Sequence, residues 1–274
     1  MPLPFLSPSD SVEASRSYVL VTGASMGIGE AFARAFARMG RNLVLVARSA
    51  ALLQALGEEL RRKHGIDVHV CVEDLSEPES PGRIYAFCAS RQVEVELLVN
   101  CAGVSCAGDF DHLPLQRLHE IVMVNMVALA NLTRLFACDM VQRKRGGVIN
   151  VASLGGIQAV PGLGLYSATK SFVITLSEAL HIELKEKGVA VVALCPGFID
   201  TGFFSHSGHN AAALRLPVYG IDLVIKAALR GLKQNRMRVF PTALDKLLVF
   251  SQRMVTRQTA IRLAGFFAAV KRSH

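Results

Sequence analysis

A tyrosine and a lysine four residues apart, Tyr166 and Lys170, lie in a segment with helical periodicity. At this spacing both side chains leave the same face of a helix and can reach one ligand. An isolated tyrosine titrates near about pH 10, and a neighbouring ammonium group is expected to lower that pKa toward neutrality. The pair predicts a tyrosine that transfers a proton, although a single Tyr and Lys at this spacing also occurs on helix surfaces without function.

A serine follows an apolar strand-like run, GVINVA, at Ser153. Open α/β sheets bind ligands at the carboxyl ends of their strands, so this hydroxyl is placed to donate a hydrogen bond to a substrate oxygen. The surrounding residues do not form the GxSxG turn of a serine hydrolase, which excludes that class.

A glycine-rich turn joins the first apolar run, YVLVT, to a helical segment. Its glycines, Gly23, Gly27 and Gly29, have GxxxGxG spacing, with Ser25, Met26 and Ile28 between them. Glycine lets the backbone approach a pyrophosphate, and the N–H groups at the start of the following helix stabilise the negative charge. The order of strand, glycines and helix predicts a dinucleotide site.

The end of the second apolar run, LVLVAR, indicates which dinucleotide binds. An NAD-specific site has an acidic residue at this position for the ribose hydroxyls, and the chain has Ala47 there, followed by Arg48. A guanidinium suits the 2′-phosphate of NADP through charge-assisted hydrogen bonds. NADP(H) is therefore expected in preference to NAD(H); the alternative is that Arg48 only faces solvent.

The elements that must position these groups alternate between short apolar runs and longer helical segments, which predicts βαβ units and one parallel sheet. The expected fold is α/β, a doubly wound parallel (Rossmann) sheet of about seven strands with helices on both faces. Strands are expected at residues 18–22, 42–47, 67–71, 97–100, 148–152, 189–195 and 237–240. Helices are expected at 27–39, 49–64, 78–90, 113–143, 164–187 and 218–234.

Together these motifs resemble the short-chain dehydrogenase/reductase family over about residues 17–202. Thr22 to Gly29 is similar to its TGxxxGxG motif, and Tyr166 to Lys170 to its YxxxK motif. Asn100-Cys101-Ala102-Gly103 resembles its NNAG motif, with Cys101 in place of the second Asn. The remaining matches are Asp74-Leu75, Asn125, Ser153, Pro196-Gly197 and Thr201.

The resemblance implies an NADP(H)-dependent enzyme that interconverts a carbonyl and a secondary alcohol, with Tyr166 as the acid/base and Lys170 also fixing the nicotinamide ribose. It implies that Asn125 holds a water linked to Lys170, which completes an Asn-Ser-Tyr-Lys tetrad. Asn100 is expected to steady the sheet. The other implied cofactor contacts are Asp74 and Leu75 at the adenine, Ala102 and Gly103, and Pro196, Gly197, Ile199 and Thr201 at the nicotinamide. The alternative is a protein that senses NADPH without turnover, or a lipid-associated scaffold.

The segment after Pro196-Gly197, residues 198–220, resembles the substrate-covering loop of the family. Phe198, Phe203, Phe204 and Leu214 would form an apolar lid, which favours a hydrophobic substrate such as a 3-oxoacyl thioester, a steroid-like ketone or another lipid carbonyl. The alternative is that these side chains pack on the protein itself.

The composition predicts one folded domain, because 51% of the 274 residues are hydrophobic and 19% are charged. Residues 17–240 are expected to form it, residues 1–16 a disordered arm and residues 241–274 an extension. Neither a signal peptide nor a membrane-spanning segment is predicted, and six scattered cysteines suit reduced core residues, so a cytoplasmic protein is expected. The eight histidines have no metal-ligand spacing, so no metal is expected.

Positive charge is concentrated at the end of the chain, since residues 226–274 contain eleven Lys or Arg and one acid, Asp245. Possible partners are an acidic acyl carrier protein, an anionic membrane surface, or water alone. On one helix Arg262 would lie about 180° from Arg253, so a membrane-lying helix is less favoured than a solvated or subunit-contacting segment. No nucleic-acid motif is present, and the family implies a homodimer or homotetramer built through residues 113–143 and 164–187.

Overall fold

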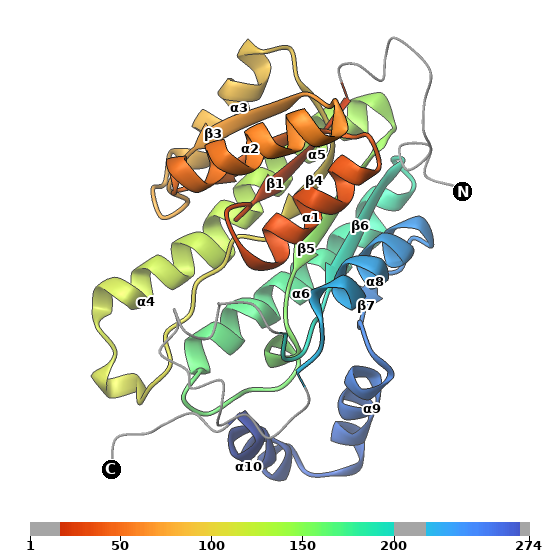
Figure 1. Ribbon diagram of the computed structural model, residues 1–274. Helices are drawn as coiled ribbons and strands as arrows, with labels where there is room; N and C mark the ends of the chain where they lie inside the picture. Colours follow the sequence, from red (N-terminus) through yellow and green to blue (C-terminus); the bar gives the residue numbers. More distant parts are fainter. Residues whose placement is uncertain (1–16, 200–217, 269–274) are drawn as a thin grey trace.

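Seven parallel strands form one sheet in the order β3-β2-β1-β4-β5-β6-β7. The structure is a computed structural model that describes residues 17–199 and 218–268 (Figure 1). The strand order reverses between β1 and β4, as in doubly wound folds, which confirms the predicted Rossmann architecture. The strands are β1 (Ser17–Thr22), β2 (Asn42–Ala47), β3 (Val68–Val72), β4 (Glu94–Asn100), β5 (Gly146–Val151), β6 (Val189–Leu194) and β7 (Arg238–Val239).

Helices cover both faces of this sheet (Figure 1). One face is covered by α1 (Gly27–Arg38), α2 (Ala50–His64) and α8 (Ile221–Lys233). The other is covered by α3 (Ser80–Ser90), α5 (Leu129–Arg143) and α6 (Gly164–Lys185). Because the strands are buried on both sides, they are apolar at nearly every position rather than at alternate ones.

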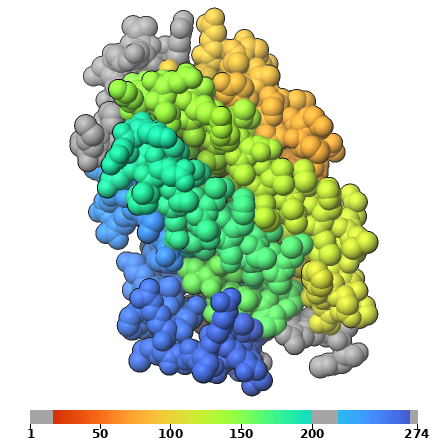
Figure 2. All heavy atoms as spheres, turned by 180° about the vertical axis from the view of Figure 1, so that it is seen from behind, coloured from red at the N-terminus to blue at the C-terminus, as the bar shows by residue number. Residues whose placement is uncertain are grey.

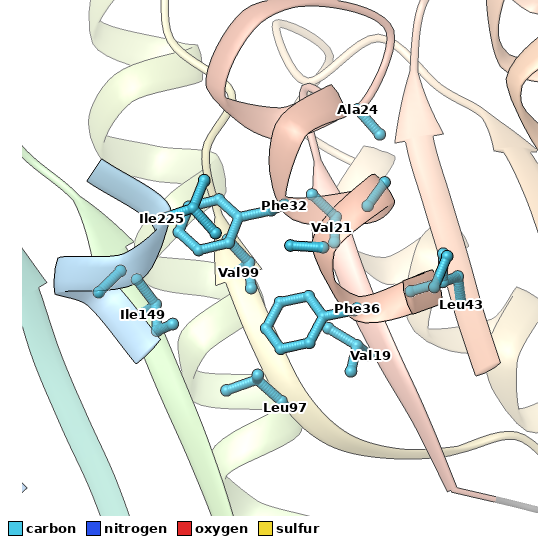
Figure 3. Packing of buried hydrophobic residues seen from close by; sticks show 14 of the residues in the cluster. Val19, Val21, Ala24, Phe32, Phe36, Leu43, Leu97, Val99, Ile149 and Ile225 are labelled. Atoms are coloured by element: carbon cyan, nitrogen blue, oxygen red, sulfur yellow. The ribbon is translucent and has the colours of Figure 1, made fainter. Parts of the chain in front are cut away.

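The strand β1 shows how this packing arises from the sequence. Val19 and Val21 belong to the core under α1, whereas Leu20 points into the core on the opposite face. Figure 3 shows Phe32 and Phe36 of α1 packed over Val19, Val21 and their neighbours on the central strands. Both rings are almost fully buried, and each such burial contributes about 1.5–3 kcal/mol to stability.

The segment predicted as one helix at 113–143 consists of three parts. The helix α4 (Leu115–Val122) continues through a π-helical turn, η4 (Met123–Ala128), into α5. Within the described residues this is one continuous helix, Leu115–Arg143, long and apolar enough to cross a membrane by length and composition, and 56% of its apolar window is buried inside the fold. Ile121, Leu132 and Phe136 are buried in the core, which accounts for its apolar character.

The last predicted elements differ from the structure in extent. The helix expected at 218–234 begins at Ile221, because Tyr219 is extended and pairs with Ile199. The strand expected at 237–240 is reduced to two residues of β7. The remaining strands lie within about three residues of their predicted bounds, the usual uncertainty at element ends.

The extension beyond the last strand forms two helices that the sequence analysis left unassigned. They are α9 (Ala243–Ser251) and α10 (Arg257–Ala268), joined by the short turn η7 (Gln252–Met254). Thr242 and Asp245 form a capping box at the start of α9. The predicted arm at 1–16, the substrate loop at 200–217 and the end of the extension at 269–274 lie outside the described residues.

Candidate active site

The turn after β1 is built from glycines that no other residue could replace without a shift of the backbone. Gly23 and Gly27 have positive φ angles of 66° and 59°, which side chains disfavour. A Cβ atom on Gly23 would lie 2.9 Å from the backbone of Ala102, and one on Gly29 would overlap the carbonyl oxygen of Gly23. The turn therefore leaves its backbone N–H groups accessible at the start of α1, where a pyrophosphate can bind.

This turn is tied to the neighbouring strand β4 by a threonine hydroxyl. The Thr22 oxygen accepts hydrogen bonds from the N–H groups of Cys101 and Ala102 at 3.0 and 3.1 Å. These bonds hold the ends of β1 and β4 together at the point where the strand order reverses. Cys101 occupies the family's second Asn position, and burial raises the pKa of its thiol to about 12.

At the end of the cavity where the family resemblance predicts the adenosine, called the adenosine end below, Arg48 already has acidic partners. Its guanidinium lies 3.1 Å from the Glu120 carboxylate and 3.7 Å from that of Asp74, and 59% of its side chain is exposed. Burial raises the pKa of Asp74, but hydrogen bonds from Ser76 and the charge of Arg48 outweigh it, so the net shift is downward. Asp74 is therefore a fixed carboxylate at this edge.

Asn100 lies beneath the site and is not among the residues that line its cavity; its predicted contact with the cofactor stays a prediction. Its side-chain NH₂ donates to Thr133 and to Asn150, both at 2.9 Å, and the Asn150 NH₂ donates to Ser177 at 3.0 Å. These polar side chains are buried. They link β4 and β5 to α5 and α6, which is the steadying role that the resemblance implies.

Asn125 lies in the π-helical turn η4 and is also absent from the cavity wall. Its side chain exchanges two hydrogen bonds of 2.9 Å with the backbone of Val104 and donates a third to Thr169 at 3.1 Å. A Cβ atom on Gly103 would lie 3.3 Å from the Lys170 ammonium nitrogen and 3.5 Å from the Asn125 carbonyl oxygen. Asn125 thus positions the segment after β4 beside Lys170.

The helix α6 and the end of β5 bring the proposed acid–base groups together. The Lys170 ammonium donates to the carbonyl of Val151 at 2.8 Å and lies 5.7 Å from the centre of the Tyr166 ring. The Tyr166 hydroxyl is hydrogen-bonded to the Ser153 side chain. Ser153 is fixed because its oxygen also accepts from the N–H of Gly155 at 3.1 Å.

Burial dominates the pKa values of Tyr166 and Lys170; the predicted lowering of the Tyr166 pKa by Lys170 together with an oxidised nicotinamide stays a prediction. Burial raises the pKa of Tyr166 to about 12, although the hydrogen bond from Ser153 opposes the shift. Burial also lowers the pKa of Lys170 to about 8. Burial disfavours both the phenolate and the ammonium form, and with pKa values of about 12 for Tyr166 and about 8 for Lys170 both groups carry a proton at neutral pH.

A network missed by the sequence analysis anchors the extension to the other side of the site. The N–H of Gly197 donates to the Tyr219 hydroxyl at 2.6 Å, and that hydroxyl donates to Asp245 at 2.9 Å. A Cβ on Gly197 would lie 2.6 Å from the Asp245 carboxylate. The T-x-x-D pattern of a capping box at Thr242 was the sequence signal for α9. No sequence pattern indicated the bond between Tyr219 and Asp245.

One cavity of about 550 Å³ connects these groups. Glu73, Arg117, Val160, Leu163 and Ala268 also line it, without having been predicted. Thr201, Phe203, Phe204 and Leu214 lie outside the described residues, and residues 17–199 and 218–268 contain no cluster that could hold a metal ion. The predicted residues that line it are Gly23, Ser25, Met26, Gly27, Ile28, Gly29, Arg48, Asp74, Leu75, Ala102, Gly103, Ser153, Tyr166, Lys170, Pro196, Gly197, Phe198 and Ile199.

Known proteins share both the sequence motifs and the fold. The family model described as short chain dehydrogenase matches residues 17–212. A protein of Streptomyces violaceoruber named as a ketoacyl reductase of the granaticin polyketide synthase is 37% identical over 190 residues, which cover 69% of this chain and 70% of its own. A very-long-chain 3-oxoacyl-CoA reductase of Anas platyrhynchos is 32% identical over 194 residues, 68% of this chain and 60% of its own length.

Solved structures give the same result. A short-chain dehydrogenase from Sphingobium yanoikuyae in complex with NADPH is 31% identical, with a TM-score of 0.78 over 87% of this chain and 94% of its own. The chain belongs to the short-chain dehydrogenase/reductase family. It is an oxidoreductase that acts on CH–OH and C=O groups of small molecules with a nicotinamide cofactor.

Proposed function

We propose that this protein is an NADP(H)-dependent reductase of hydrophobic ketones, with 3-oxoacyl thioesters and bulky lipid or steroid-like ketones as its substrate class. The observation that carries the proposal is the convergence of Tyr166, Ser153 and Lys170 on one cavity whose other end is the glycine turn. A dinucleotide fits because Gly23, Gly27 and Gly29 line this cavity at the start of α1, where backbone N–H groups suit a pyrophosphate. When bound, its nicotinamide supplies the hydride.

The proton chemistry belongs to this chain's own residues. Ser153 donates a hydrogen bond to the substrate oxygen and orients the carbonyl beside Tyr166. Tyr166, protonated at neutral pH, gives its hydroxyl proton to that oxygen as the alcohol forms. Lys170, held by the Val151 carbonyl, stabilises the phenolate left behind and holds the nicotinamide ribose.

The adenosine end supports a preference for NADP(H). Arg48 lines the cavity next to Asp74, where the adenine and its ribose would lie, and no acidic residue occupies position 47. In this proposal the guanidinium leaves Glu120 to bind the 2′-phosphate, whose greater charge makes it the stronger acceptor.

The inner wall of the cavity supports an apolar substrate. Val160, Leu163 and Phe198 line it near Tyr166, and the cavity also reaches Ala268 at the end of α10. Apolar walls with a few polar groups at the reacting atom are typical of sites for hydrophobic ligands. The relatives named for ketoacyl and 3-oxoacyl-CoA reduction are consistent with this class. We place the protein in the cytoplasm, where its six free cysteines stay reduced.

The test is a fluorescence titration of the purified protein with NADPH and with NADH. It is followed by the decrease in reduced-nicotinamide absorbance across ketones and 3-oxoacyl thioesters of increasing chain length. The proposal predicts tighter binding of NADPH and a kcat/KM that rises with apolar chain length. Equal binding of both nucleotides contradicts the NADP preference. A kcat/KM that falls with chain length contradicts the substrate class.

A further inference from the structure

The helices α9 and α10 expose an unusual number of large apolar side chains. Seven of the seventeen exposed large hydrophobic residues of the described chain lie between positions 244 and 266. Met254 is 77% exposed, Leu247 61% and Phe250 57%. We call the α9–α10 face the surface formed by Leu244, Leu247, Phe250, Met254, Val255, Leu263 and Phe266 with the basic residues Lys246, Arg253, Arg257 and Arg262.

The apolar residues follow helical spacing, so they form a surface rather than scattered points. Leu244, Leu247 and Phe250 are three residues apart on α9, and Leu263 and Phe266 repeat this spacing on α10. Figure 2 shows the two helices gathered at one end of the molecule. Several exposed large apolar side chains on two neighbouring helices are typical of a site of interaction.

The charge on this face is positive without compensation. Lys246, Arg253, Arg257 and Arg262 are all exposed, and among the described residues none of them forms an ion pair. The one acid of the segment, Asp245, is buried, where it caps α9 and accepts from Tyr219. Because the turn η7 separates α9 from α10, the projection of the segment onto a single helix does not describe how these charges are arranged.

The face is joined rigidly to the catalytic cavity. Ala268, at the end of α10, lines that cavity, and a Cβ on Gly265 would lie 3.2 Å from the ring of Pro161. Asp245, at the start of α9, is linked through Tyr219 to Gly197 in the cavity wall. Whatever covers the α9–α10 face therefore lies near the cavity, whose wall includes Ala268 of α10.

We propose that the α9–α10 face docks on an anionic lipid membrane. The apolar side chains can insert at the boundary between lipid headgroups and acyl chains, and the flanking cations can meet the anionic headgroups. A membrane therefore accounts for both the exposed apolar residues and the positive charge. A second copy of this chain would bring like charges against each other across a symmetric contact. An acidic protein would pair with the cations but would leave the exposed Phe250 and Met254 unexplained.

The consequence for function is access to apolar substrates. A ketone dissolved in the membrane would lie next to the cavity bordered by Ala268 and would not have to cross water. The docking surface itself does not depend on the identity of the substrate, so it can be tested separately from the proposed reaction.

The experiment is flotation of the full-length protein with vesicles of phosphatidylcholine alone or with phosphatidylglycerol added, at low and high salt. We expect binding to the anionic vesicles that is at least about tenfold stronger than to the neutral ones and that weakens with salt. The double variant Phe250→Ser/Met254→Ser and the double variant Arg253→Gln/Arg257→Gln should each lose at least about tenfold in binding.

The matched control is Leu52→Ser/Arg62→Gln, which removes one exposed apolar residue and one exposed cation from α2 and should bind like the unaltered protein. Retained NADPH binding and reduction of a water-soluble ketone show that the variants fold. Absence of flotation with anionic vesicles, or equal loss in the α2 control, overturns the proposal. Sedimentation measures whether the unaltered protein is an oligomer. If that oligomer does not float with vesicles and the α9–α10 variants dissociate it, the face binds a second copy of this chain and the membrane proposal is overturned.

Discussion

The two ends of the cavity hold their charged groups in opposite surroundings. At the adenosine end Arg48 is 59% exposed and shared between Glu120 and Asp74. At the catalytic end Lys170 is only 4% exposed, and its pKa is lowered to about 8. Exposed ion pairs are weak and exchange partners readily, whereas burial of a cation lowers its pKa and makes its proton easier to remove. The adenosine end is therefore suited to selecting a cofactor and the catalytic end to moving a proton.

The largest effect is expected where the proton moves. Tyr166→Phe removes the hydroxyl and should lower kcat by about 10²–10⁴-fold, the usual contribution of general acid catalysis. Cofactor affinity should change by less than about threefold, because the ring and its packing remain. Steady-state kinetics with a nucleotide titration check both. A variant that retains more than a tenth of kcat would show that Tyr166 is not the acid.

Substitutions in the glycine turn should act through steric overlap rather than through charge. Gly29→Ala places a methyl group against the Gly23 carbonyl, and we expect a loss of about 1–3 kcal/mol in the free energy of unfolding, with weaker nucleotide binding. Urea denaturation and a fluorescence titration measure the two effects.

The matched control is Gly82→Ala, in α3, where a Cβ meets nothing within 4 Å. This variant should be more stable by about 0.5–1 kcal/mol, because alanine favours a helix. Nucleotide binding that survives Gly29→Ala at full strength would be incompatible with a close approach of the backbone to the cofactor.

The buried lysine should affect stability in the opposite direction from activity. Its folded-state pKa of about 8 lies below its ordinary value of 10.5, so the unfolded chain binds more protons between these pH values. Burying the charged form is unfavourable below pH 8, and this cost disappears as the pH rises to 10.5.

Lys170→Met should therefore raise the free energy of unfolding at neutral pH by about 2 kcal/mol, after the lost bond to Val151 is deducted. The gain should shrink as the pH rises through that window, as measured by urea denaturation at several pH values, while activity is lost. If Lys170→Met instead lowers the free energy of unfolding by the same amount at every pH, burial does not lower the pKa of Lys170.

The exposed arginine should affect the choice of cofactor more than its overall affinity. Arg48→Ala should weaken NADPH binding by about tenfold and leave NADH binding within about twofold, since only the 2′-phosphate is lost as a partner. Titration of the variant with both nucleotides measures the ratio. Equal weakening of the two would remove Arg48 from the selection of the cofactor.

The smallest effect is expected at the acidic partner of that arginine. Glu120→Gln removes the negative charge that competes for Arg48, and NADPH affinity should rise by about two- to fivefold at low salt. The rise should vanish in the double variant Arg48→Ala/Glu120→Gln. A decrease in NADPH affinity on removal of the carboxylate would mean that Glu120 positions the arginine instead of competing for it.

The sequence predicted the local patterns around the cavity better than its long-range contacts. Glycines at Gly23 and Gly29, and the spacing of Tyr166 and Lys170, are local patterns with a direct structural cause, so they could be recognised along the chain. The pairing of Arg48 with Glu120 joins residues 72 positions apart and depends on how α4 packs beside β2. No local pattern contains that information.

The same reason explains what the sequence could not show about protonation and about the end of the chain. The predicted downward shift of the Tyr166 pKa considered the charges of Lys170 and an oxidised nicotinamide, whereas the burial of Tyr166 and Lys170 is revealed only by the packed fold. The apolar residues from Leu247 to Phe266 have helical spacing, but spacing alone does not show which of them face outward. The bond of Tyr219 to Asp245 holds the start of α9 against the body of the protein.

The most direct test of the central claim is a single-turnover reaction. Stoichiometric NADPH is bound to the protein and mixed with an excess of a hydrophobic ketone, while the reduced-nicotinamide absorbance and the alcohol product are both quantified. We expect one alcohol to form for each NADPH consumed, and Tyr166→Phe to bind the nucleotide but leave it reduced. Tight NADPH binding with no alcohol formed by the unaltered protein would identify a sensor rather than an enzyme.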